Sequence, residues 1–198
     1  MSVEDAVEDL KEGKFIIMID DEKRENEGDL IIPAEKVNEE KLNFMLKIAR
    51  GILCLPMSGK RLDELGIPMM VQDPTDKLQT PFTVSIDHKT TTTGVSVPDR
   101  IKTIKAILDK NSKPEDFHRP GHIFPLRAND KLLEGRKGHT EAAVELMNLA
   151  NLQPVALIAE ILDQDGSMPK LESLKRISKE HGIRIIHIED ITNLKKKG

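Results

Sequence analysis

The sequence has no tryptophan, no tyrosine and only one cysteine, Cys54, among 198 residues. A single cysteine excludes an internal disulfide framework and a cysteine-rich zinc module, and it agrees with a reducing compartment. Aromatic residues make up 3% of the chain and the net charge is −4. Both the stacking surface and the positive charge of nucleic-acid-binding proteins are therefore missing, and we expect no nucleic-acid partner.

The sequence also lacks an apolar run long enough to span a membrane. Residues 1–14 are acidic and have neither the basic region nor the apolar region of a secretory signal. We expect a cytoplasmic protein with no membrane partner. Its 38% hydrophobic and 32% charged residues are typical of a globular chain, and its length suits one domain over residues 1–198.

Apolar runs and helical stripes alternate along the chain, which predicts an α/β (α+β) fold with a mixed β-sheet flanked by helices. The predicted strands are Phe15–Ile19, Leu30–Ile32, Ile52–Leu55, Phe82–Asp87, Val155–Leu162 and Arg184–Ile188. The predicted helices are Val3–Leu10 capped by Ser2, one after the cap Asn38, a brief one after Ser58, one after Pro98, one from Glu141, and Pro169–Lys179.

All of the net charge sits in one stretch, residues 20–29, between two predicted strands. This stretch has two basic residues, Lys23 and Arg24, against six acids: Asp20, Asp21, Glu22, Glu25, Glu27 and Asp29. Such a cluster suits a hard divalent cation, with magnesium as the natural candidate, but it does not have the spacing of an EF-hand. The alternative is a solvated turn. The position of Arg24 among the acids favours a site for a metal-bound phosphorylated substrate.

A second candidate site precedes a predicted helix at residues 136–140. A helix N-terminus offers free N–H groups and a positive dipole, so Arg136, Gly138 and Thr140 could hold a phosphate while His139 faces a metal ion. The alternative is ordinary capping by Thr140 beside an exposed histidine.

Further candidates for chemistry lie in the middle and the second half of the chain. His122 follows a rigid turn within residues 119–127 and could act as an acid or base, or could be satisfied by a backbone carbonyl. Glu160 interrupts an apolar strand, where a carboxylate is costly unless it is paired, protonated or used, or unless the strand ends in solvent. Cys54 fits a buried inert thiol or a pocket wall, and residues 90–96 fit a substrate contact or a capped loop.

Four of these segments occur in an order that closely resembles 3,4-dihydroxy-2-butanone 4-phosphate synthases. They are residues 20–29, 92–96, 119–127 and 138–142, and the similarity runs from Val7 to Asp190. The resemblance implies a lyase of riboflavin biosynthesis that converts D-ribulose 5-phosphate into formate and L-3,4-dihydroxy-2-butanone 4-phosphate. It also implies a monofunctional enzyme and a homodimer with active sites near the subunit interface.

The resemblance further implies a role for individual residues. Glu25 and His139 would bind Mg2+, two ions per site, with Mn2+ as a substitute. Turnover would depend on His122 and Glu160. The residues expected to hold substrate are Arg24, Glu25, Asp29, Arg136, Lys137, Gly138, His139, Thr140 and Glu160. Those expected near the pocket are Glu27, Cys54, Thr92 and Thr93. Asp20, Asp21 and Glu22 would shape the turn or its field.

Two other functions use the same residues. One is a magnesium-assisted phosphosugar isomerase or lyase whose reaction stops at the enediolate. The other is a non-catalytic protein that binds a metal ion or a sugar phosphate. Because His122 and Glu160 are residue types suited to proton transfer, the sequence favours an enzyme over a binding protein.

Overall fold

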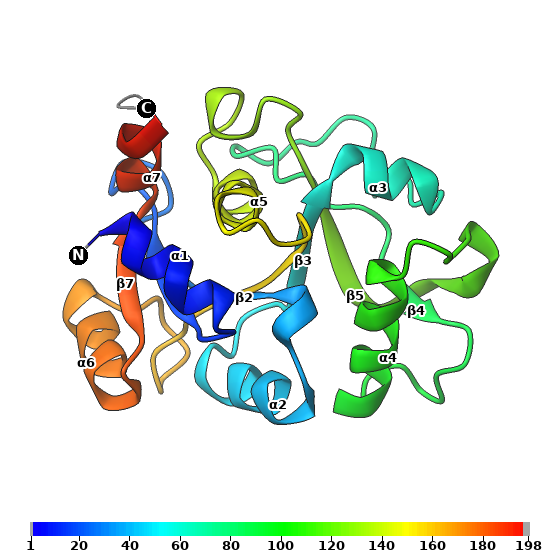
Figure 1. The fold of residues 1–198 in the computed structure, drawn as a ribbon, viewed down its shortest axis with the longest axis horizontal. Coiled ribbons are helices and arrows are strands. Elements are labelled where there is room, and N and C mark those ends of the chain that lie inside the picture. Colours follow the sequence, from blue (N-terminus) through cyan, green and yellow to red (C-terminus); the bar gives the residue numbers. More distant parts are fainter. Residues whose placement is uncertain (1, 196–198) are drawn as a thin grey trace.

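The computed structural model describes residues 2–195 and confirms the predicted fold class. Within this range one seven-stranded mixed sheet runs through the molecule, and helices cover both of its faces (Figure 1). Met1 and residues 196–198, which the predicted domain also includes, lie outside the described residues.

The elements follow the chain in a mixed order of strands and helices. The strands are β1 (Ile16–Ile19), β2 (Gly28–Pro33), β3 (Cys54–Ser58), β4 (Ile86–His88), β5 (Phe117–Ala128), β6 (Ala156–Glu160) and β7 (Arg184–His187). The helices are α1 (Val3–Lys11), α2 (Glu39–Ile48), α3 (Gly59–Glu64), α4 (Val97–Leu108), α5 (His139–Leu149), α6 (Leu171–His181) and α7 (Ile188–Lys195). Short 3-10 turns span Ala34–Lys36, Pro114–Asp116 and Leu132–Glu134.

The strand order is β4-β5-β3-β6-β2-β1-β7. Strand β1 pairs antiparallel with β2 and parallel with β7, while β3 pairs parallel with β5 and antiparallel with β6. The register sets Asp29 of β2 opposite Glu160 of β6, and Cys54 of β3 opposite Ile158 of β6. Three of the polar residues expected at the site are therefore brought together by the central strands.

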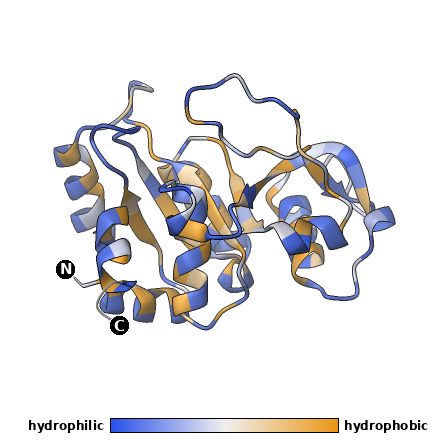
Figure 2. Ribbon diagram, turned by 90° about the horizontal axis from the view of Figure 1, so that it is seen from above, coloured by the Kyte–Doolittle hydropathy of each residue, from blue (hydrophilic) through white to orange (hydrophobic). Residues whose placement is uncertain are grey.

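The sheet separates two apolar cores, because successive side chains of a strand point to opposite faces. Ile17 and Ile19 of β1 belong to one core, whereas Ile16 and Met18 belong to the other. Helices α1, α5 and α7 contribute to the second core, and Figure 2 shows the apolar residues concentrated on the strands and on helix sides that face them. Burial on both faces explains the unbroken apolar sequence of β1.

The predicted strand Phe82–Asp87 is wrong in extent and in the face it buries. Only Ile86–His88 forms β4, and the polar residues Thr83 and Ser85 are buried. Thr83 Oγ1 donates to the Pro125 carbonyl oxygen at 2.9 Å, and Ser85 Oγ accepts the Gly121 N–H at 3.1 Å. These hydrogen bonds allow hydroxyl groups inside the protein, which a period-two pattern assigns to the outside.

Strand β5 and helix α7 were not predicted, and the predicted start of helix α5 was wrong. Strand β5 contains two prolines and a glycine, which favour an irregular segment in sequence analysis, and α7 follows β7 without a linker. Helix α5 begins at His139 rather than at Glu141, with Gly138 as its N-cap and no side-chain cap. The alternative in which Thr140 caps this helix is therefore wrong.

The N-cap of α2 gives a test of the link from sequence to structure. Asn38 Oδ1 accepts the Lys41 N–H at 2.9 Å, as the sequence predicts. We expect Asn38→Ala to lower the free energy of unfolding by about 1 kcal/mol, because one N–H of the first turn loses its partner. Urea unfolding measures the change. Asn38→Asp, which keeps the acceptor, should stay close to the wild type, and equal losses in both variants would contradict the capping role.

Candidate active site

The acidic loop, residues 20–27, connects β1 to β2 and folds around the buried carboxylate of Asp20. Asp20 accepts the backbone N–H of Glu25 at 3.1 Å and that of Glu27 at 2.9 Å. Asp20 also accepts from Arg24 Nη1 at 2.9 Å. These contacts turn the loop back over the edge of the sheet, so Glu25, Glu27 and Asp29 line one cavity.

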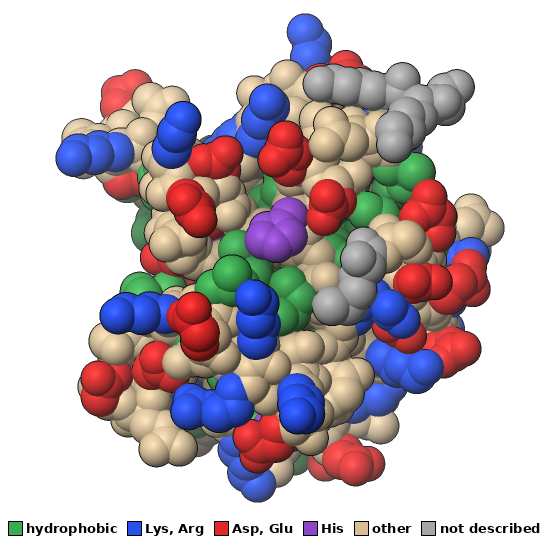
Figure 3. All heavy atoms as spheres, turned by 90° about the vertical axis from the view of Figure 1, so that its left-hand side faces the viewer, with side chains coloured by type: hydrophobic (Ala, Val, Ile, Leu, Met, Phe, Trp, Pro, Cys, Tyr) green, Lys and Arg blue, Asp and Glu red, His purple; other side chains and the backbone are tan. Residues whose placement is uncertain are grey.

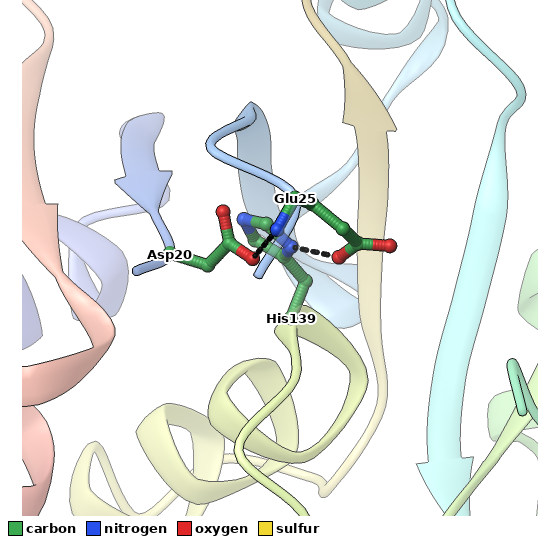
Figure 4. Close-up of side chains that lie close together, drawn as sticks. All are labelled: Asp20, Glu25 and His139. Atoms are coloured by element: carbon green, nitrogen blue, oxygen red, sulfur yellow. Dashed lines mark hydrogen bonds and ion pairs between the residues drawn. The ribbon is translucent and has the colours of Figure 1, made fainter. Parts of the chain in front are cut away.

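The first turn of α5 meets this loop from the second half of the chain. His139 is 6% exposed, and its Nδ1 lies 3.6 Å from Glu25 Oε2 (Figure 4). Its Nε2 lies 3.2 Å from the carbonyl oxygen of Met18 and 3.9 Å from Asp29 Oδ1. The expected meeting of Glu25 and His139 is present in the structure, and the alternative of an exposed histidine is wrong.

Asp20, Glu25 and His139 form a group that can hold a metal ion. Their nearest ligand atoms all lie within 4.8 Å of one another, slightly wider than the ~4 Å between opposite ligands of an octahedral magnesium ion. Among the described residues, the buried Asp29 Oδ1 has no hydrogen-bond partner. Arg24 Nη1 contacts the carboxylates of both Asp20 and Glu25. The donor set fits a hard divalent cation. In this structure the Arg24 guanidinium supplies the positive charge beside the carboxylate oxygens of Asp20 and Glu25.

Burial and charge act against each other on the titratable groups of this site. Burial raises the pKa of Asp29 to about 7, since the charge of His139 offsets only part of the effect. Burial alone would lower the pKa of His139, but Asp29 and Glu25 raise it to about 9. Burial also acts to raise the pKa of Glu25, yet the nearby ring of His139 and the charge of Arg24 bring it below its usual value. Nearby positive charge thus keeps the pKa values of the site's carboxyl groups lower than burial alone would set them.

The cavity beside the cluster is small, about 50 Å³. Its lining residues are Arg24, Glu25, Glu27, Asp29, Cys54, Thr80, Phe82, Leu126, Arg136, His139, Thr140, Ile158 and Glu160. Glu160 is the last residue of β6, and its Oε2 accepts the Ile52 N–H at 2.8 Å. Cys54 is both buried and part of the wall, and burial raises the pKa of its thiol.

Two arginines stand beside the N-terminus of α5 because residue 138 has no side chain. A Cβ at Gly138 would lie 2.2 Å from Arg136 Nη1 and 3.0 Å from Arg24 Nη2. Arg136 is held by Glu141 at 2.8 Å and by the Leu78 carbonyl oxygen at 3.1 Å. Two guanidinium groups at a helix N-terminus make a suitable site for a phosphate group.

Lys137 does not line the small cavity. It is exposed and borders a neighbouring cavity of about 620 Å³, which lies between the acidic loop and α7. On the face of the molecule seen in Figure 3, acidic and basic side chains are interspersed. The role of Lys137 in holding substrate stays a prediction.

His122, Thr92 and Thr93 also do not line the small cavity. His122 Nδ1 lies 2.7 Å from Asp87 Oδ2, and Thr92 Oγ1 donates to Asp99 Oδ2 at 2.7 Å. The alternative in which a backbone carbonyl satisfies His122 is therefore wrong, since its partner is a carboxylate. The predicted roles of these three residues in catalysis or at the pocket stay predictions.

Four lining residues were missed by sequence analysis: Thr80, Phe82, Leu126 and Ile158. Ile158 could have been found from its strand, because it lies two residues before Glu160 and thus on the same face. Leu126 lies in β5, which was not predicted as a strand, so no pattern indicated the direction of its side chain.

Among the helices of residues 2–195, none has the length and apolar character needed to cross a membrane.

The fold and the site define an α/β protein in which a cluster that can hold a cation lies beside a helix N-terminus that can hold an anion. The family model for 3,4-dihydroxy-2-butanone 4-phosphate synthase matches residues 4–194. The chain belongs to this family, as its sequence motifs predict.

Similar proteins support the assignment over nearly the whole chain. A 3,4-dihydroxy-2-butanone 4-phosphate synthase of Agrobacterium fabrum is 47% identical over 98% of this chain and 92% of that protein. The riboflavin biosynthesis protein RibBA of Endomicrobium trichonymphae is 49% identical over 99% of this chain, but over only 49% of its own length. The chain thus spans about half the length of several curated relatives that it matches.

The solved structures agree with these relatives. A crystal structure of 3,4-dihydroxy-2-butanone 4-phosphate synthase in complex with two magnesium ions has a TM-score of 0.95 and 36% identity. The match covers 100% of this chain and 97% of that chain. The agreement therefore extends over the whole architecture.

The space at Gly138 can be tested without changing a charged group. We expect Gly138→Ala to weaken binding of inorganic phosphate about tenfold, because the new Cβ pushes Arg136 away and a charge-assisted hydrogen bond is worth more than 1.4 kcal/mol. Titration calorimetry measures the affinity. Ser112→Ala is the control, since it leaves every charged group in place and lies outside the residues that line the small cavity. Undiminished phosphate binding by Gly138→Ala would contradict the anion site.

Proposed function

We propose that the protein converts D-ribulose 5-phosphate into L-3,4-dihydroxy-2-butanone 4-phosphate and formate, with magnesium at the cluster of Asp20, Glu25 and His139. The observation that carries this proposal is the meeting of Glu25 and His139, which are 114 positions apart, next to Arg24 and Arg136. The magnesium ions in the similar crystal structure support the choice of metal. Two ions per site, and manganese as a substitute, belong to the same proposal.

Each side chain of the site has a task in this reaction. Arg136 and the N-terminus of α5 would hold the phosphate, and Arg24 can leave Glu25 for the phosphate once that carboxylate holds a cation. When bound, magnesium supplies positive charge for oxyanions that form along the reaction. Glu160 lines the cavity and is half-buried, so its carboxylate can take and return a proton beside the substrate.

The small cavity is not isolated from the rest of the surface. Arg24 lines both this cavity of about 50 Å³ and the neighbouring cavity of about 620 Å³. Its guanidinium lies against the carboxylates of Asp20 and Glu25, so release of Arg24 would open these carboxylates to a metal ion and substrate.

We also propose a homodimer in which His122 of one copy serves the cavity of the other. The proposal is supported by the position of His122 outside the small cavity of its own chain and by its exposed ring, of which 43% is accessible. The apolar side chains of Ile52, at 52%, and Val95, at 50%, are likewise exposed. Exposed apolar side chains of this kind are suitable for contact with a second copy of the chain.

The reaction itself is tested with the pure protein, D-ribulose 5-phosphate and magnesium. We expect formate, detected with formate dehydrogenase, in amounts equal to the substrate consumed. An isomerase that stops at the enediolate would consume substrate without formate, and a binding protein would leave it unchanged. Sustained absence of formate from folded protein would refute the proposed reaction.

The metal site is tested by Glu25→Gln. We expect magnesium-dependent turnover to fall on the order of 10²-fold or more, because a carboxylate that holds the cation becomes a neutral amide. The matched control is Glu22→Gln, an exposed residue of the same loop that should retain activity. Formate release across a range of magnesium concentrations distinguishes the two. If Glu25→Gln keeps wild-type rates and metal dependence, the metal assignment is wrong.

The shared site is tested by mixing inactive variants. His122→Ala and Glu25→Ala should each be inactive, whereas mixed dimers contain one site in which both His122 and Glu25 are intact. We expect exchange of subunits to restore up to about a quarter of wild-type activity, since half of the dimers are mixed and each has one of two sites. Formate release before and after mixing measures the recovery. No recovery despite proven exchange would place both residues in one chain.

A further inference from the structure

Asp87 and His122 form a pair on two adjacent strands at one edge of the sheet. Asp87 of β4 accepts the backbone N–H of His122 on Oδ1 at 2.9 Å, and its Oδ2 lies 2.7 Å from His122 Nδ1. The Asp87 side chain is 10% exposed, whereas the His122 ring is 43% exposed. The carboxylate is therefore inside the protein and the ring extends from it toward solvent.

The backbone at Gly94 packs against one side of this pair. Gly94 has φ +82°, and a Cβ there would lie 1.9 Å from Asp87 Oδ2 and 2.6 Å from His122 Nδ1. Gly94 thus lies directly over the hydrogen bond, where no side chain fits. The loop that carries Gly94 is itself held by Asp99, which accepts the N–H groups of Thr92 at 3.1 Å and Gly94 at 3.3 Å.

Arg100 of α4 is the charged group whose positive charge acts on the Asp87 carboxylate from the neighbouring helix. Within residues 2–195 its buried Nε has no hydrogen-bond partner. On β4 itself the next residue, His88, is turned to Thr90 Oγ1 at 2.8 Å. Within the described part of the chain, Asp87 is the acidic residue in contact with the His122 ring, and the contact is to Nδ1.

We propose that Asp87 is a positioning residue, which holds the His122 ring with Nδ1–H donating to Oδ2 and leaves Nε2 as the proton-transfer atom. The inference rests on the proposed function, in which His122 serves turnover. A proton taken from substrate would enter the Nε2 lone pair while Nδ1 keeps its own proton. The same proton would later be returned from Nε2 to an oxygen of the reacting molecule, which restores the neutral ring. The carboxylate stabilises the imidazolium that exists between these two transfers.

Asp87→Asn separates positioning from folding. The Asn side chain can keep Oδ1 as acceptor for the His122 N–H, but it presents an NH₂ group to Nδ1 and so favours the opposite tautomer, with the proton on Nε2. We expect kcat to fall on the order of 10²-fold or more with KM and magnesium dependence little changed. Nitrogen-15 NMR of labelled histidine, at a pH of about 8.5 where an ordinary imidazole is neutral, should show the tautomer change.

The matched control is Asp116→Asn, which removes a carboxylate beside β5 that holds Lys89 and the Lys113 N–H but contacts no histidine by hydrogen bond. It should keep kcat and the His122 tautomer. Gly94→Ala is the second variant, because its Cβ displaces the pair while both functional groups remain. We expect it to lower kcat as Asp87→Asn does.

The outcomes distinguish this inference from the proposed function. Wild-type protein that releases formate, combined with Asp87→Asn at a kcat within twofold of wild type, would overturn the positioning role. Nε2–H on His122 in the wild type would overturn it as well, even if Asp87→Asn does not fold. A wild type that releases no formate refutes the proposed reaction instead, while the NMR spectrum still decides the tautomer.

Discussion

The site depends on the burial of His139 beneath an acidic loop that cannot neutralise itself. The carboxylates of Asp20 and Asp29 are buried and that of Glu25 is partly buried, and isolated carboxylates are costly inside a protein. His139 and Arg24 supply the compensating charge, one from α5 and one from the loop itself. The attraction between the loop carboxylates and His139 holds the loop against α5. It offsets part of the repulsion within a stretch that carries all of the net charge of the chain.

The parts of the fold that follow from local rules could be predicted. Asn38 caps α2 because a short polar side chain precedes an amphipathic run, and β1 is buried on both faces because its sequence is apolar throughout. Thr83 and Ser85 could not be placed, since their burial depends on partners about 40 positions away. The same holds for β5, whose backbone forms a strand through pairing with β3 and β4 despite its prolines.

The candidate site likewise contains residues that the sequence indicated and residues that only the structure reveals. Glu25 and His139 are of residue types that suit a metal ion, and family resemblance joined them across the chain before the structure did. Asp20 was expected to shape the turn, and it accepts two N–H groups of the loop. Asp87 was not assigned to chemistry, because nothing in its local sequence shows that it contacts His122. A carboxylate that acts through a partner 35 positions away leaves no local pattern; it is recognised only when the strands are paired.

Arg24 connects the two halves of the proposed site. Its guanidinium lies against Asp20 and Glu25, while Gly138 leaves room for it beside Arg136 at the start of α5. A cation at the carboxylates would remove the reason for Arg24 to stay there, and a phosphate at α5 would attract it in the other direction. On this reasoning, metal and substrate should each favour binding of the other, because each stabilises the same displacement of one side chain.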